Sequence, residues 1–382
     1  NANLESVSLD GTTTDGSLTV SFDTNNSATN TLRVDGNISN VSTLQFTGGT
    51  DANDIVDINA DIAAASIEIQ DVHNVLIDAS VSRNLTAMDG NVSVLSSTGE
   101  IQFNNGDSTV AINSMGGSVQ LSDVATLDSD LTIDSKSNVT LAEVELNDSG
   151  AISVAFDTDD NEAAFLQLNG EIRNATSVTF AAGGTGTDDR INVAGNIDAD
   201  AGDIDFGNAS VVSIDALAAR SINAEAGSVL LNSVGTIELT GGSQLISMIA
   251  EQDVLLTDVS DVGGNAIAAS LEIQAGDNAN LESVSLDGTT TDGSLTVSFD
   301  TNDADANTLH IDGYISNVST LQFTGGSDTN DIVDINADIS AGSIVIQEVH
   351  NVLIDASESR NLTAMDGNVS IHQIADGIEI DG

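Results

Sequence analysis

Aspartates at short, regular spacing are the residues of this sequence that most suggest chemistry. The segment GGTDANDIVDINADI at 48–62 recurs as GGSDTNDIVDINADI at 325–339, and a related glycine-led turn, GGTGTDDRI, lies at 183–191. Carboxylate oxygens clustered around such turns are hard ligands of the kind that Ca²⁺ prefers. The sequence therefore predicts calcium ligands among the aspartates of these three segments: Asp51, Asp54, Asp57, Asp61, Asp188, Asp189, Asp328, Asp331, Asp334 and Asp338.

An alternative interpretation is that these aspartates are solvated residues of turns and strand faces. Asp51 and Asp54 fall in the predicted turn, whereas Asp57 and Asp61 share the outward face of a predicted strand. The turn at 183–191 is similar to the GGxGxD calcium turn of repeat-in-toxin proteins, but its apolar position is shifted by one residue and no full nonapeptide recurs in tandem. With 60 acidic and 7 basic residues, stacked carboxylates need dissolved cations for neutralisation, either Ca²⁺ or bulk salt.

Other reactive groups give weaker signals. Acidic pairs accompany most repeat units, and no unique cluster joins acidic, basic and aromatic residues as sugar cleavage needs. Neither a G-x-S-x-G nucleophile motif nor a phosphate-binding loop is apparent. His73 and His350 occupy the same position in two copies of VHNVLIDA and are expected at the surface. The sequence predicts that the protein is not an enzyme, with a polysaccharide-degrading enzyme as a distant alternative.

The chain contains repeats on two scales. Residues 1–94 recur at 278–371 with 15 differences, and a diverged copy of 16–46 lies at 150–180. Self-similarity at fixed spacing indicates a repeat architecture. We therefore expect one continuous domain over 1–382, with long repeats at about 1–134, 135–277 and 278–382, the last of them shorter.

A shorter unit with the pattern apolar-x-small-x-x-Gly-x-apolar-x-apolar runs through the long repeats, as in INAEAGSVLL at 222–231. Its first apolar residue recurs at a nearly constant spacing, although not every unit can be placed around 100–135. The positions that define this spacing are Ile38, Ile62 and Leu85, then Ile172, Ile197, Ile222 and Ile246, then Ile315, Ile339 and Leu362.

Each unit holds short runs of alternating polar and apolar residues, as in SLTVSF at 17–22. A period of two is typical of a strand with one buried face, and the runs are separated by turn residues. The chain has no proline, which would break a hydrogen-bonded ladder, and no tryptophan of the kind expected in tandem β-sandwiches. The sequence thus predicts an all-β protein, a parallel β-solenoid of about 24 residues per coil and roughly 16 coils.

The unit in INAEAGSVLL and in IDADAGDIDF at 197–206 resembles the repeats of filamentous-haemagglutinin-type adhesins and of the passenger stalks of large bacterial autotransporters. The resemblance covers most of the chain and is one of period and composition. It implies a right-handed parallel β-helix that is exported and displayed at the cell surface as a fibre. No secretion domain or membrane barrel is visible, so we expect a segment of a longer chain or a protomer whose ends meet others.

Charge and composition limit the possible partners. The net charge of −53 disfavours nucleic acid and anionic membrane surfaces. The chain has no cysteine and no apolar run long enough to span a membrane. The expected location is extracellular, and the expected partners are other copies of the chain, end to end or laterally, and glycans or a host or neighbouring cell surface. Two functions stay open: an adhesin stalk, or a surface-layer or sheath filament protein assembled by Ca²⁺.

Overall fold

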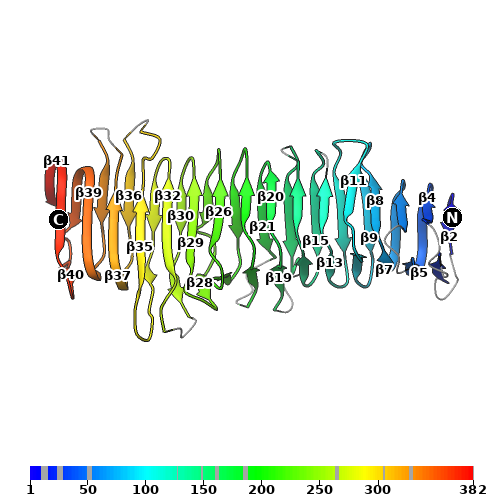
Figure 1. The fold of residues 1–382 in the computed structure, drawn as a ribbon, viewed down its shortest axis with the longest axis horizontal. Coiled ribbons are helices and arrows are strands. Elements are labelled where there is room, and N and C mark those ends of the chain that lie inside the picture. The colour runs from blue at the N-terminus through cyan, green and yellow to red at the C-terminus, as the bar shows by residue number, and fades with distance from the viewer. Residues whose placement is uncertain are drawn as a thin grey trace. The chain divides into compact units, whose positions relative to one another are not determined.

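The computed structural model describes residues 1–9, 16–23, 29–49, 54–126, 128–147, 149–159, 163–183, 188–262, 266–303, 306–326 and 330–381. Its regular secondary structure, over these residues, consists of β-strands without any helix. The chain forms two compact units, Asn1–Gly195 and Asn196–Gly382. Each unit is a parallel β-solenoid, in which every strand lies beside its equivalent in the next coil (Figure 1). The predicted fold class is confirmed.

Three stacks of parallel strands form the sides of unit 1. The first side contains β1 (Ala2–Leu4), β4 (Thr31–Val34), β6 (Ile55–Ile58), β8 (Asn74–Asp78), β11 (Ile101–Asn104), β14 (Val124–Thr126), β17 (Val144–Leu146) and β20 (Ile172–Ala175). The second contains β2 (Val7–Ser8), the starts of β5 (Ile38–Thr47) and β7 (Ile62–Val72), β9 (Arg83–Ala87), β12 (Val110–Ser114), β15 (Leu131–Ser135), β18 (Ile152–Phe156) and β21 (Val178–Ala182). The third contains β3 (Gly16–Ser21), the ends of β5 and β7, β10 (Val92–Ser96), β13 (Val119–Leu121), β16 (Val139–Leu141), β19 (Phe165–Leu168) and β22 (Arg190–Val193).

Unit 2 has the same three-sided plan. One side contains β23 (Ile197–Ala199), β26 (Arg220–Ala224), β29 (Leu245–Ala250), β32 (Ser270–Ala275), β35 (Gly293–Ser298), the end of β37 (Ile315–Thr324), the middle of β39 (Ile339–Asp355) and the start of β41 (Val369–Asp381). The next contains β24 (Ile204–Gly207), β27 (Val229–Leu231), β30 (Val254–Leu256), β33 (Ala279–Leu281), β36 (Thr308–Ile311), β38 (Ile332–Ile335) and the ends of β39 and β41. The last contains β25 (Val211–Asp215), β28 (Thr236–Thr240), β31 (Val259–Asp261), β34 (Val284–Ser285), the starts of β37 and β39, and β40 (Leu362–Ala364).

The spacing of the short sequence unit reappears in the register between strands. Residues that the sequence places at the same point of successive units are direct partners in the parallel ladders. The pairs that confirm this are Ile38 with Ile62, Ile62 with Leu85, Ile197 with Ile222, Ile315 with Ile339, and Ile339 with Leu362.

One predicted step is wrong. Ile246 pairs with Arg220, and the partner of Ile222 is Met248. The coil between them is longer than the sequence pattern indicates, because a corner absorbs additional residues without changing the alternation of the strands. The same effect resolves the irregular region, where Leu85 pairs with Ile112 across a long coil and Ile112 pairs with Ile133 across a shorter one.

Coil size therefore varies around the predicted mean. The predicted number of roughly 16 coils differs slightly from the about 13 turns obtained when three strands are counted to a turn. Several long strands follow the chain around its corners: β7 supplies two sides, and β39 supplies all three. In β5 and β37 the corner residues are Asn40 and Asn317, whose φ angles of 55° and 52° lie in the left-handed region.

The core of each unit is aliphatic and narrow. Inward residues alternate with partly exposed ones along nearly every strand, as in β12, where Val110 and Ile112 are fully buried and Ala111 and Asn113 are not. The inward side chains stack on one another from coil to coil, so an apolar side chain within a unit is covered on both sides by its equivalents. A single coil has no such cover, which is why burial here depends on repetition.

Candidate cation-binding residues

Asp54 lies in the turn that precedes β6, and it is completely buried. Oδ2 accepts a hydrogen bond from the amide of Gly49 at 2.7 Å, and Oδ1 accepts one from the amide of Asn30 at 3.2 Å. Its carbonyl oxygen accepts the amides of His73 and Asn74 in the following coil. Asp54 thus joins three consecutive coils through backbone groups.

The two other long repeats contain an aspartate in the same role. The fully buried Asp331 accepts the amides of Gly326 at 2.7 Å and Asn307 at 3.3 Å. The buried Asp189 accepts the amide of Ala164 at 2.9 Å. Three of the ten predicted calcium ligands are therefore buried acceptors for backbone N–H groups.

Asp57 and Asp334 lie on the outward faces of β6 and β38, as the alternation predicts. Asp57 forms an ion pair with Arg33, its register neighbour one coil earlier, at 3.2 Å. In the second copy a histidine replaces this arginine, and Nδ1 of His310 lies 3.1 Å from Asp334. These carboxylates therefore face a side chain that carries or can take up positive charge.

Asp61 and Asp338 lie at the corner before the next strand. Oδ1 of Asp61 accepts the amide of Asn84 at 3.0 Å, and Oδ1 of Asp338 accepts the amide of Asn361 at 2.8 Å. In each case a side-chain oxygen of one coil binds the backbone of the next coil.

This corner contact continues over several coils of unit 2. A polar side chain just before each strand accepts the amide of the equivalent residue, or of the first strand residue, one coil later. The chain of contacts runs from Asp203 to the amide of Ser228 at 2.8 Å, from Ser228 to Asp253 at 3.4 Å, from Asp253 to Asn278 at 3.0 Å, and from Asn278 to Thr308 at 2.9 Å. We refer to these four contacts as the corner ladder.

The other predicted calcium ligands do not form a cluster in the described part of the chain. Asp51 and Asp328 lie outside the described residues, and Asp188 is exposed. Within the described part of the chain, no three of the predicted aspartates bring ligand atoms within 4.8 Å of one another. Calcium binding by these ten residues stays a prediction, and any bound ion must compete with the backbone amides and cationic side chains described above.

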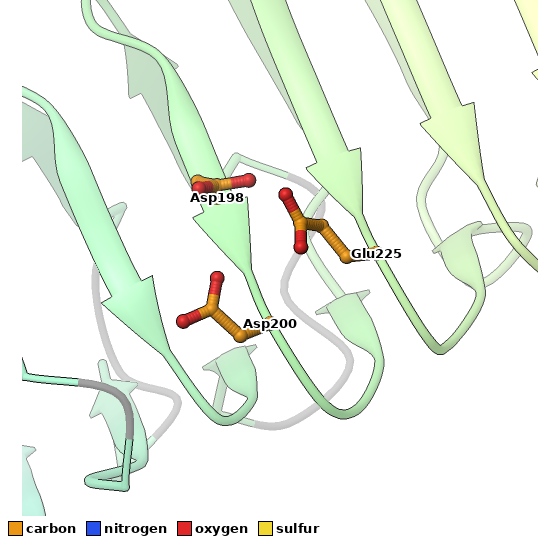
Figure 2. Close-up of side chains that lie close together, drawn as sticks. All are labelled: Asp198, Asp200 and Glu225. Carbon is orange, nitrogen blue, oxygen red and sulfur yellow. The ribbon is translucent and has the colours of Figure 1, made fainter.

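A cluster of acidic residues that the sequence argument did not single out lies in unit 2. Asp198 is in β23, Asp200 follows that strand, and Glu225 follows β26. One carboxylate oxygen from each lies within 4.8 Å of the others, and Figure 2 shows the three groups turned toward a common space. We call these residues the acidic triad.

The surroundings of the acidic triad fit a hard cation. Asp198 and Asp200 are half-buried and Glu225 is exposed, and the side-chain amide of Asn223 donates to Asp198 at 2.7 Å. Oxygen ligands from carboxylates suit Ca²⁺, which tolerates an open and irregular coordination shell. The available signal in the sequence was an acidic residue at the same point of two consecutive units, in IDADAG and INAEAG.

Neutralising two members of the acidic triad tests for cation binding. The double variant Asp200→Asn/Glu225→Gln is expected to be more stable than wild type in chelator, by about 0.5 kcal/mol, because like charges no longer face each other. Millimolar Ca²⁺ is expected to raise the melting temperature of wild type but not of this variant. Glu272→Gln is the control, because it removes the same charge from a residue whose register neighbours, Ser247 and Thr296, are not acidic. An equal calcium response in all three proteins would contradict a site at the triad.

On the neighbouring side of the same coil, Asp205 in β24 is a carboxyl group with a raised pKa. Burial raises the pKa of Asp205, and the negative charge of the neighbouring Asp203 raises it further. A carboxyl whose folded-state pKa is raised takes up a proton in the folded chain before it does in the unfolded chain, so it favours folding more as the pH falls. At neutral pH its charge opposes folding.

We therefore expect Asp205→Asn to be more stable than wild type at pH 7. The advantage should shrink as the pH falls through the raised pKa toward the ordinary aspartate value of 3.8, because in that range wild type binds a proton in the folded state that its unfolded chain does not yet bind. Urea unfolding of both proteins between pH 7 and pH 4 measures the difference, and taking the difference removes the contribution of the other carboxylates. An advantage that does not change with pH would contradict the assignment.

The fold and these contacts define a repeat protein of the parallel β-solenoid class. Comparison with protein-family models, with curated proteins and with solved structures finds no match to this chain. None of the described residues belongs to a helix long and apolar enough to cross a membrane.

Proposed function

We propose that this chain is a non-catalytic structural module of an extracellular bacterial surface fibre or adhesin stalk. The observation that carries the proposal is that the long repeats multiply a structural contact. Asp54, Asp189 and Asp331 place the same buried carboxylate on backbone amides of a neighbouring coil. A catalytic group is needed once, whereas a residue that ties coils together is needed in every repeat.

The mechanical consequence follows from the parallel ladders. Every coil is held to its neighbours by main-chain hydrogen bonds on three sides and by a continuous aliphatic core, so unfolding one coil exposes the core of the next. Such a module suits a component of a surface fibre that must resist proteolysis and keep a fixed length. The net charge of −53 keeps neighbouring copies apart in dilute salt.

Labelling of intact bacteria that produce the protein tests this function. Antibodies against the purified chain should decorate structures at the cell surface in immunogold electron microscopy. Mild protease treatment of whole cells should remove the antigen while cytoplasmic marker proteins stay intact. Labelling confined to the cytoplasm of sectioned cells would overturn the proposal.

The acidic triad favours a second candidate, a surface-layer or sheath filament protein assembled by Ca²⁺. In that case millimolar Ca²⁺ should convert the soluble protein into regular arrays visible by electron microscopy, and Asp200→Asn/Glu225→Gln should prevent it. For the adhesin stalk we expect calcium to change stability without ordering the protein into arrays. Binding to a glycan array would favour the adhesin.

A further inference from the structure

Three of the four methionines occupy one position of the repeating unit. In LTAMDG at 85–90, INSMGG at 112–117 and LTAMDG at 362–367, a methionine directly follows the small inward residue that ends a strand. Elsewhere the same position holds Glu225 of the acidic triad, which is exposed. The fourth methionine, Met248, lies inside β29 and is completely buried. The unit thus has an outward corner position at which thioethers are concentrated.

Met88 and Met115 are neighbours on successive coils of unit 1. They directly follow Ala87 in β9 and Ser114 in β12, which are register partners. The amide of Met115 donates a hydrogen bond to the carbonyl oxygen of Ala87 at 2.8 Å. The side chains of Met88 and Met115 are 50% and 58% exposed, although coils pair on both sides of β9 and of β12. Their exposure is therefore a property of the corner within the solenoid.

Accessible thioethers are the groups of this chain that oxidants attack most readily. The chain has no cysteine, no tryptophan and a single tyrosine. A peroxide converts methionine to its sulfoxide, and susceptibility follows exposure. In this reaction an S–O bond forms, the O–O bond breaks, and the second oxygen takes up the proton of the transferred hydroxyl and leaves as water. The sulfur is oxidised and the peroxide is reduced, so no further reagent is needed.

The only lysine of the chain lies beside Met115. Lys136 follows Ser135, the register partner of Ser114, and it lines the same surface hollow of about 480 Å³ as Met115. Its ammonium group donates to Asp159 at 2.8 Å, and an ammonium group has three N–H donors. The hydrogen bond to Asp159 raises the pKa of Lys136, so the side chain stays charged at neutral pH. In this place an ammonium group can donate to the leaving oxygen of a peroxide.

We propose that Met88 and Met115 form a peroxide-reactive site, at which thioethers become sulfoxides while the solenoid stays folded, and that Lys136 assists the reaction at Met115. The fold tolerates the change because both side chains lie outside the aliphatic core, so the polar S=O group stays in water. Met248 is protected, because peroxide reaches its sulfur only when the coil opens. The inference goes beyond the stalk function, since it gives the module a stoichiometric reaction with small oxidants.

Peptide mass spectrometry during a time course in hydrogen peroxide tests the site. In the folded protein, Met88 and Met115 are expected to gain one oxygen at least about tenfold faster than Met248. In urea that unfolds the chain, the rates at these three residues should become equal, which shows that the fold sets the difference. Protein oxidised only at Met88 and Met115 should keep its β spectrum and melt within about 2 °C of the unmodified protein.

A substitution at Lys136 tests the assistance at Met115. Lys136→Gln is expected to slow oxidation of Met115 by about threefold or more, because a hydrogen bond to the leaving oxygen is lost, while the rate at Met88 stays unchanged. Lys136→Arg keeps a cationic donor and should retain the rate. Arg33→Gln is the matched control, because it removes a cationic side chain from β4, on another side of unit 1. It should change neither rate.

Four results would overturn the proposal. They are a Met248 that oxidises as fast as Met88 and Met115 in the folded protein, rates that stay unequal in urea, loss of the folded state when only Met88 and Met115 are oxidised, and an unchanged rate at Met115 in folded Lys136→Gln protein. Each of them leaves the surface-fibre function open, because a stalk does not need to react with peroxide. Cytoplasmic labelling of the cells would overturn the function whatever the methionines do.

Discussion

Replacing Asp54 with alanine is expected to lower the free energy of unfolding of the surrounding coils by about 3 kcal/mol, whether or not calcium is present. The variant leaves the amides of Gly49 and Asn30 without their carboxylate acceptor, and the Gly49 contact is buried while the Asn30 contact is partly buried. Hydrogen bonds to charged groups contribute about 1.5–3 kcal/mol each, and an unpaired buried donor adds its own cost. Urea unfolding in chelator and in excess Ca²⁺ measures the effect.

Asp57→Ala is the matched control, because Asp57 lies on the strand beyond the turn and forms only a surface ion pair with Arg33. We expect that substitution to cost less than about 1 kcal/mol. Asp331→Ala should repeat the large loss in unit 2, since Asp331 makes the same two contacts. A large loss in calcium together with almost none in chelator would instead identify Asp54 as a metal ligand.

Phe323→Ala in β37 is expected to destabilise unit 2 by about 3–5 kcal/mol, the usual cost of removing a buried aromatic ring. Phe323 is completely buried, and its register neighbours are Val297 in the preceding coil and Ile346 in the following one. Neither neighbour can move far into the cavity, because each is fixed by its own strand ladder. Thermal unfolding followed by circular dichroism should show a lower midpoint without loss of the β spectrum at low temperature.

Phe165→Ala provides the comparison, because the same residue type at the start of β19 is 40% exposed. A change of no more than about 0.5 kcal/mol is expected there. If the two variants lost equal stability, the inward stacking of Phe323 would not be what holds these coils together.

The strands and their inward faces were predictable from sequence because a period of two is a local property. Val110 and Ile112 are buried and Ala111 is not, as alternation alone requires. The register between neighbouring strands was harder to predict, because it depends on the number of residues in each corner. The extra residues before β29 move the partner of Ile222 from Ile246 to Met248, and no residue type in that corner gives its length.

The candidate site was predictable only in part, for a related reason. Asp57 has the expected outward position, because strand alternation fixes it. Asp54 is in a turn, where strand alternation does not predict whether a side chain points inward or outward. Its side chain points inward and accepts hydrogen bonds from two backbone amides. The acidic triad forms between coils, and its signal in the sequence was the acidic residue at the same point of two consecutive units, Asp200 and Glu225, which the strand register brings side by side.

The corner ladder gives its own corner of unit 2 a chemical polarity. In each of its contacts, a side-chain oxygen of an earlier coil accepts an amide of a later one, from Asp203 through Ser228 and Asp253 to Asn278. A finished coil already holds the acceptors that the next segment requires on its C-terminal side. At this corner, a polypeptide that folds from its N-terminus can therefore add one coil at a time, and each new coil finds its hydrogen-bond acceptors already in place on the preceding coil. At the turns that hold Asp54, Asp189 and Asp331 the sense is reversed, because there an amide of the earlier coil waits for a carboxylate of the later one.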